Sequence, residues 1–256
     1  MKNLFIILLL FAGFLKSSAQ VNEIEHFYIA SPEAKAHFDL FVSEFDLPVE
    51  WDYQDYGGFS TGGVTLGNVV LEFVGAETPF LGIALEPSQT ADKIIPVLDS
   101  AKIRHDEILK FPFWSTVTLM DMLPEHIYLF LCDYHDRGYV VSGREESTQK
   151  LIKRDGGSLG LIKVDQLTLG VKEPTGYLQE LRKLPGVDLQ NETLTFSKGP
   201  KLVVLEKPTP FFGILAKVHS VEKAKQKLQS LDIPFTINEK RLMIDEQQFG
   251  MRITLE

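Results

Sequence analysis

The chain repeats Val69-Val70-Leu71-Glu72 as Val203-Val204-Leu205-Glu206, and a second motif follows each copy. The second motif reads Thr78-Pro79-Phe80-Leu81-Gly82-Ile83 after the first copy and Thr209-Pro210-Phe211-Phe212-Gly213-Ile214 after the second. Two motifs in the same order and at nearly the same separation indicate a duplicated architecture. We therefore expect a fold built from internal repeats, and the differences between the copies carry the information on function.

Each half of the chain divides again into two units of one pattern. Residues 24–30 alternate as a strand, Ser31-Pro32-Glu33 is typical of a helix start, and apolar positions from Ala34 to Phe45 share one helical face. Three short strands are then predicted, over 49–53, 59–65 and 68–74. The same order returns near residues 80, 162 and 211. Each unit has one apolar helix face and a sheet that needs covering, so we expect the four units to pair.

The first 19 residues have the composition of a secretory signal peptide. Lys2 precedes an apolar run over 4–15, and Ser17-Ser18-Ala19 favours cleavage before Gln20. The run is shorter than the roughly 20 residues of a membrane span, although an uncleaved signal anchor is the alternative. We expect a periplasmic or secreted protein that is free of the membrane once the signal is removed. Its predicted parts are a domain over 20–136, a linker over 137–159 and a domain over 160–256.

Composition excludes several classes of protein. The net charge of −9 becomes about −11 without Lys2 and Lys16, which disfavours nucleic acid or an anionic membrane as a partner. Cys132 is the only cysteine, so no intrachain disulfide can form. The sequence has no phosphate-binding Gly-Lys-Ser/Thr loop and no paired metal-binding cysteines. It carries no signal for an oligomeric state.

The repeat pattern resembles the vicinal oxygen chelate superfamily, which includes glyoxalase I and the extradiol dioxygenases. The resemblance rests on the tandem strand-helix-three-strand units, on Glu25-His26-Phe27 in the first strand and on the segment 62–72 that closes the first unit. The resemblance is most specific in that first unit, whose sequence is similar to the glyoxalase-like members of the superfamily. The resemblance implies an α+β fold in which four βαβββ units form two cup-shaped glyoxalase-like domains, the second of them degenerate.

The resemblance also implies a divalent metal site in the first cup, with one position on each of four strands. The matching residues are His26, Glu72, Gly82 and Asp133. His26, Glu72 and Asp133 form a mixed nitrogen and oxygen set, compatible with zinc, manganese, iron(II) or nickel. Gly82 stands where extradiol cleavage needs its second histidine, so that chemistry is disfavoured.

Alternatives remain open at each of these positions. His26 and Glu72 are polar residues on mainly apolar strand faces, so they could pair with each other, or Glu72 could lie solvated on an edge. A one-residue shift in register would turn Cys132 inward in place of Asp133. In the second domain Gln166 and Glu206 match His26 and Glu72, which favours a structural or substrate-shaping role over a second site.

Two functions follow from the resemblance. The first is an exported metal-dependent lyase or isomerase acting on a small oxygenated substrate, with Glu72 or Asp133 moving a proton. The second is a non-catalytic protein that binds or sequesters a small molecule. In either case six aromatic residues are candidates for the pocket wall, although an aromatic stripe is more often core: Trp51, Tyr53, Tyr56, Phe59, Phe113 and Trp114.

Overall fold

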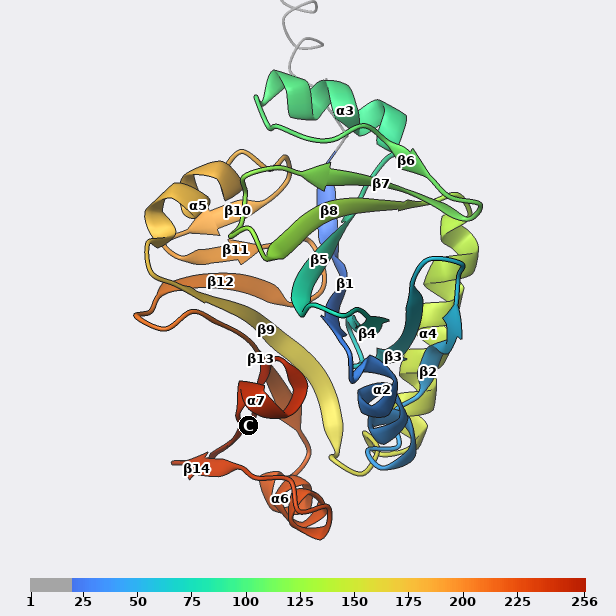
Figure 1. The fold of residues 1–256 in the computed structure, drawn as a ribbon, viewed down its shortest axis with the longest axis vertical. Helices are drawn as coiled ribbons and strands as arrows, with labels where there is room; N and C mark the ends of the chain where they lie inside the picture. The colour runs from blue at the N-terminus through green and yellow to red at the C-terminus, as the bar shows by residue number, and fades with distance from the viewer. Residues whose placement is uncertain (1–19) are drawn as a thin grey trace, which may run out of the picture.

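The computed structural model describes residues 20–256, and the signal peptide predicted over 1–19 lies outside the described residues. The strands within residues 20–256 form two eight-stranded sheets (Figure 1). The strands of the first sheet are β1 (Val21–Ser31), β2 (Val49–Asp55), β3 (Ser60–Thr65), β4 (Val70–Gly75), β5 (Phe80–Pro87), β6 (Leu109–Lys110), β7 (Trp114–Leu119) and β8 (Ile127–Tyr134). Those of the second are β9 (Leu161–Val171), β10 (Asp188–Gln190), β11 (Thr193–Thr195), β12 (Lys201–Glu206), β13 (Phe211–Val218), β14 (Thr236–Asn238), β15 (Arg241–Ile244) and β16 (Arg252–Leu255).

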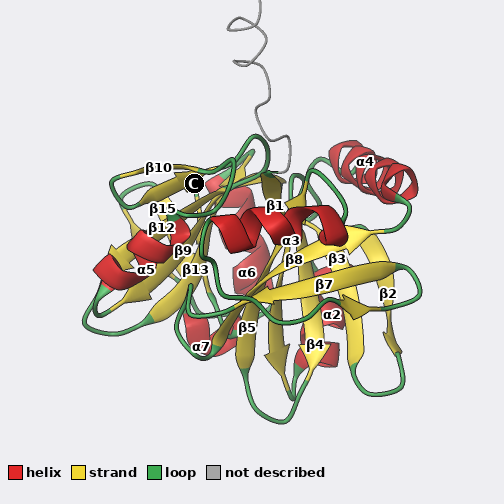
Figure 2. Cartoon of the chain, turned by 90° about the horizontal axis from the view of Figure 1, so that it is seen from above, coloured by secondary structure: helices red, strands yellow, loops and turns green. Residues whose placement is uncertain are grey.

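Both sheets have the same topology. The strand order is β2-β3-β4-β1-β5-β8-β7-β6 in the first sheet and β10-β11-β12-β9-β13-β16-β15-β14 in the second. In each, two antiparallel central strands join the two units, and each central strand pairs in parallel with the closing strand of its own unit. The sheets are curled (Figure 2). The predicted α+β architecture of four paired units is therefore confirmed.

One helix follows the first strand of each unit, as the repeat predicts. These helices are α2 (Ala34–Ser43), α3 (Ala91–Ser100), α5 (Pro174–Leu181) and α6 (Val221–Ser230). Ser31 does not cap α2, however, because it belongs to β1 and the helix begins after Glu33 without a side-chain cap. The apolar face of the helix is enough to hold it on the sheet, with Ala34, Phe38 and Phe41 buried.

Within the described residues, two helices have no counterpart in the repeat. The short α7 (Glu246–Phe249) lies before the last strand, and the longer α4 (Arg137–Lys153) occupies the segment expected to be a linker. Figure 1 shows α4 running beside β2 and β3 of the first sheet. No helix within residues 20–256 is long and apolar enough to cross a membrane.

The two domains share one hydrophobic core. Phe249 of α7 packs between Phe41 and Phe45 of the first domain, at ring-centroid distances of 5.3 and 6.3 Å. Asn68 adds a polar link, because its side chain donates to the carbonyl of Val164 and accepts from the amide of Val164, each at 2.8 Å. The domains are therefore held together by buried contacts rather than by the connecting helix alone.

Candidate functional site

His26 and Glu72 meet on one face of the first sheet. Glu72 on β4 is in register with Tyr28 on β1, and His26 lies two residues before Tyr28, so both side chains point to the same side. His26 Nε2 is 3.3 Å from Glu72 Oε2, and the two side chains are only 7 % and 13 % exposed. Of the alternatives open from sequence, an edge position for Glu72 is therefore excluded, and contact with His26 is observed.

Glu25 reaches the same histidine because β1 is irregular at this point. Ile24 is opposite Leu85 and His26 is opposite Ala84, so Glu25 is an extra residue in the pairing of β1 with β5. Such a bulge redirects side chains that would otherwise alternate. Glu25 Oε2 contacts His26 Nδ1 and accepts a hydrogen bond from the Tyr134 hydroxyl at 3.1 Å. The imidazole thus has a carboxylate at each nitrogen.

These contacts set the protonation of the three groups. Burial alone would lower the pKa of His26, but Glu25 and then Glu72 raise it above its ordinary value. Burial would raise the pKa of Glu25, but His26, Arg144 and Tyr134 bring it below its usual range. Burial dominates at Glu72 and raises its pKa, since His26 and Thr61 offset only part of the desolvation. Glu72 is therefore the carboxylate best suited to hold and release a proton.

Neighbouring groups hold Glu72 and shield the pair from water. Thr61 Oγ1 donates to Glu72 Oε1 at 2.5 Å. The rings of Trp51 and Phe130 lie edge-on to the imidazole, with centroids at 6.2 and 5.7 Å. Trp51 can approach because Gly63 lies beneath it, and a Cβ on Gly63 would be 2.7 Å from the indole. The site is thus a small polar group between aromatic walls.

The Tyr28 ring occupies the space over Gly82, the one of the four matching strand positions that carries no donor side chain. The ring lies directly over Gly82, and a Cβ on Gly82 would overlap the Tyr28 ring carbons. The same ring packs against Phe80 and Phe130, at 5.7 and 6.0 Å. A histidine at residue 82 would therefore have no room unless Tyr28 moved.

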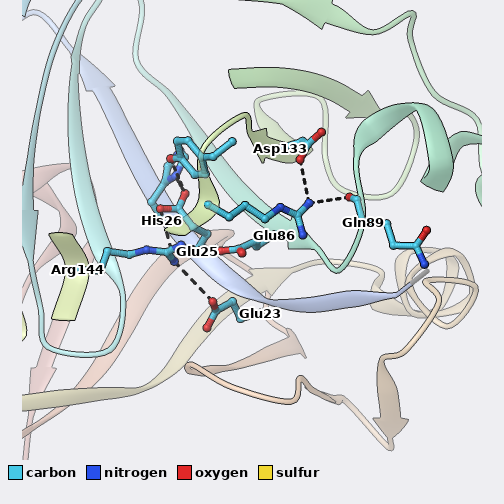
Figure 3. A network of polar contacts seen from close by, with 9 residues as sticks. Glu23, Glu25, His26, Glu86, Gln89, Asp133 and Arg144 are labelled. Atoms are coloured by element: carbon cyan, nitrogen blue, oxygen red, sulfur yellow. Dashed lines mark hydrogen bonds and ion pairs between the residues drawn. The ribbon is translucent and has the colours of Figure 1, made fainter. Parts of the chain in front are cut away.

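The structure does not bring Asp133 to His26 and Glu72. Phe130, which contacts the His26 ring, and Tyr134, which contacts Glu25, show that the even-numbered residues of β8 face the site, and Asp133 faces the other way. Its Oδ2 accepts from the amide of Ala91 at 2.7 Å and its Oδ1 accepts from Arg137 at 2.8 Å. Figure 3 shows Asp133 apart from His26. The carboxylate supports the start of α3, and the register left open from the sequence, which turns Cys132 inward in place of Asp133, is the one observed.

A metal ion would accordingly find two protein donors at this position. Within residues 20–256 no group of three His, Cys, Asp or Glu side chains is placed to hold an ion. The separation of His26 Nε2 and Glu72 Oε2 still fits two ligands of one ion, because bonds of about 2.0–2.2 Å place ligand atoms roughly 3 to 3.5 Å apart. A carboxylate on the far ring nitrogen is also the usual partner of a metal-binding histidine.

Arg144 belongs to the site but lies in the segment expected from the sequence to be a linker, where no motif marks it. Arg144 of α4 pairs with Glu86 at 2.7 Å, with Glu23 at 3.5 Å and with Glu25 at 3.8 Å (Figure 3). These carboxylates raise the pKa of the guanidinium against the lowering effect of burial. The sequence signal for such a residue was the number of acidic side chains on β1 and β5, because buried carboxylates need a cation nearby.

Most of the predicted aromatic residues lie elsewhere. Trp51 is at the site, but Tyr53 packs on Phe38 of α2, at 5.7 Å. The remaining four form exposed or local contacts: Tyr56 stacks with Phe59, Trp114 stacks with Phe111, and Phe113 is 74 % exposed. A cleft of about 770 Å³ opens instead between α4 and the first sheet, and Glu25 and Arg144 are among its lining residues.

The second domain does not assemble the same pair. The bulge recurs at Asp165, immediately before Gln166. Glu206, however, is in register with Val171, five residues from Gln166, whereas Glu72 is in register with a residue two from His26. The odd spacing puts Glu206 on the opposite face, where it is exposed. Gln166 instead donates to Thr168 at 2.8 Å.

Comparison with known proteins identifies the fold. No protein-family model and no curated protein matches the sequence. Among solved structures, the chain is similar to the Mn(II)-bound glyoxalase from Novosphingobium aromaticivorans, with 11 % identity, a TM-score of 0.61 and coverage of 93 % of this chain and 82 % of that one. An extradiol ring-cleaving dioxygenase from B. fuscum matches with 11 % identity, a TM-score of 0.62 and coverage of 94 % and 73 %.

A third neighbour is the homoprotocatechuate 2,3-dioxygenase from Arthrobacter globiformis, with 13 % identity, a TM-score of 0.58 and coverage of 92 % and 79 %. These proteins have the vicinal oxygen chelate fold, and the resemblance drawn from the repeat pattern is therefore confirmed at the level of the fold.

Proposed function

We propose that the first cup binds one divalent metal ion between His26 and Glu72 and uses it to transform a small oxygenated substrate, as an exported lyase or isomerase. The observation that carries the proposal is the pair itself: an imidazole and a carboxylate 3.3 Å apart, on one sheet face, with the other imidazole nitrogen already held by Glu25. The Mn(II) in the glyoxalase neighbour agrees with a metal in this fold. Export rests on the signal peptide predicted over 1–19.

The donor set fits zinc, manganese, iron(II) or nickel, each of which accepts nitrogen and oxygen ligands. When bound, the ion would polarise the substrate oxygens and stabilise negative charge that develops on them. With two protein donors, at least half of its coordination positions would remain for water or substrate. This openness is typical of catalytic rather than structural sites.

The residues of the chain supply the remaining functions. Glu25 holds His26 Nδ1, so the ring presents Nε2 to Glu72. Thr61 donates to Glu72 Oε1 and so orients the carboxylate with Oε2 toward His26. Oε2 would hold the ion, and it would take a proton from a substrate carbon or hydroxyl only when released from the ion. Trp51 and Phe130 exclude water from the pair, which strengthens its electrostatic interactions. Asp133 contributes nothing to this step from its position near α3.

A non-catalytic binding protein is the second candidate, and a specific observation favours it. The space over Gly82, where the family pattern has a metal ligand, is filled by the Tyr28 ring, and the Asp133 carboxylate is turned away from His26. In that case His26 and Glu72 serve as hydrogen-bonding groups for a small ligand held between Trp51 and Phe130.

Metal analysis of the purified mature protein separates the two candidates. We expect close to one divalent ion per chain in the wild type and none in the double variant His26→Ala, Glu72→Ala. The matched control is Gln166→Ala, Glu206→Ala, which changes the corresponding positions of the second domain and should retain the ion. A metal-free wild type after loading with each of the four ions would leave the binding protein as the better explanation. Mass spectrometry of the exported chain tests cleavage before Gln20.

A further inference from the structure

Helix α4 belongs to neither repeat, yet it places one side chain at the base of the site. Arg144 is about halfway along the helix, and its side chain is 18 % exposed. Figure 3 shows the guanidinium turned toward the carboxylates of the first sheet. None of the four repeated units supplies a cation at this place, so the position depends on the segment between the domains.

The two ends of the Arg144 guanidinium have different partners. Nη2 donates to Glu86 Oε2 at 2.7 Å, which ties the group to β5. Nη1 is 3.5 Å from Glu23 Oε1 and 3.8 Å from Glu25 Oε1, both on β1. The planar fork thus spans two adjacent strands, which a single ammonium group does not reproduce.

Glu25 connects this fork to the histidine. Its Oε1 faces Arg144, while its Oε2 contacts His26 Nδ1 and accepts from Tyr134. The Glu25 side chain is 2 % exposed, so its orientation depends on these partners and not on water. A carboxylate that holds the far nitrogen of a ligating histidine normally affects metal affinity strongly.

We infer that Arg144 is a positioning residue, which holds the Glu25 carboxylate in the orientation that presents His26 Nε2 to Glu72. The inference rests on the proposed function for its metal readout, but its structural content concerns the imidazole alone. Arg144 acts through Glu25, so removal of both should cost no more than removal of Glu25. Two residues that act in series are non-additive in this way.

Two measurements test the inference. The first is the affinity of the metal-free mature protein for Mn(II) or Zn(II) alone, by titration calorimetry. We expect Arg144→Gln to weaken binding by roughly 10- to 100-fold, as loss of a ligand's supporting group does. The double variant Arg144→Gln, Glu25→Gln should bind as weakly as Glu25→Gln. The matched control is Lys150→Gln on the same helix, whose ion pair with Glu146 is exposed, and it should bind as the wild type does.

The second measurement is the proton NMR signal of the His26 ring Nδ1–H in the metal-free protein. We expect a slowly exchanging downfield signal in the wild type and in Lys150→Gln, and its loss in Arg144→Gln. Near-UV circular dichroism shows whether each variant is folded. If Arg144→Gln does not fold, Arg144→Lys replaces it, because the charge is kept and the fork is lost; the same direction is expected in both measurements.

The outcomes separate the two proposals. A wild type that binds metal, with unchanged affinity and an unchanged Nδ1–H signal in the folded Arg144 variant, overturns the role of Arg144 and leaves the proposed function standing. A wild type that binds no metal overturns the proposed function, and the NMR signal then decides the role of Arg144 by itself. A double variant much weaker than Glu25→Gln would show that Arg144 does not act through Glu25.

Discussion

Replacing Gly82 with alanine tests how the space is closed at the strand position where this chain departs from the family's metal-binding pattern. Gly82 lies on β5 in register with Tyr28 on β1, and the Tyr28 ring covers it. An alanine Cβ would overlap that ring, so Tyr28 must leave its place against Phe80 and Phe130. Gly82 is not among the glycines with positive φ, so the backbone itself accepts alanine.

The magnitude follows from this conflict. Overpacking of a buried position costs about 1–3 kcal/mol, and we expect Gly82→Ala to fall in the upper half of that range because Tyr28 lies between two other rings. Tyr28→Ala alone should cost about 3 kcal/mol, from lost burial and the cavity left behind. In the Tyr28→Ala background the glycine can be replaced without conflict, and alanine should be neutral or stabilising by about 0.5 kcal/mol. The expected coupling energy is therefore about 2 kcal/mol or more.

Urea unfolding of the wild type, the two single variants and the double variant measures this coupling. Unfolding midpoints and slopes give the four free energies, and unchanged slopes show that the unfolded state is comparable. If Gly82→Ala costs the same with and without the Tyr28 ring, the ring does not close the position. A histidine at residue 82 would then be tolerated, and the Tyr28 ring would not explain why His26 and Glu72 have no third metal donor beside them.

Two further predictions concern the domain interface and the histidine. Phe249→Ala should destabilise the protein by about 3–5 kcal/mol and shift a single cooperative transition, because the ring fills a core shared by both domains; separate transitions, with the first domain unaffected, would contradict the shared core. The stabilisation that His26 provides in the metal-free protein should be largest between about pH 4.5 and 6.5, the ordinary pKa values of Glu25 and His26. As the pH rises through the raised pKa of His26 the contribution is lost, and as the pH falls through the lowered pKa of Glu25 it is lost again. Urea unfolding of wild type and His26→Gln across pH tests this, and a constant difference would refute it.

Local patterns were sufficient for most of the fold. Strand alternation, helix periodicity and the repeated motifs predicted the unit order, because each unit must bury one helix face and one sheet face. The family resemblance implied His26 and Glu72, and their place as polar residues on mainly apolar strand faces supported that choice in part. The signal peptide, the export and the substrate class stay predictions.

The prediction was wrong or incomplete where the direction of a side chain depends on the neighbouring strand. The family resemblance implied Asp133 as a ligand, but in the structure β8 turns Cys132 toward the site and Asp133 toward α3. The Glu25 side chain reaches His26 only because a bulge in β1 adds a residue opposite β5. Pairing register and bulges depend on the neighbouring strand, so the sequence of one strand does not reveal them.

By itself, the sequence determined the duplicated architecture and the two residues at the centre of the candidate site. Only the tertiary structure decided that Arg144 of α4 lies behind Glu25, that Tyr28 fills the space above Gly82 and that Glu206 faces away from Gln166. The physical reason is the range of the interactions. Periodicity reflects burial of nearby residues along one element, whereas these contacts join residues from different elements whose approach is set by packing of the whole domain.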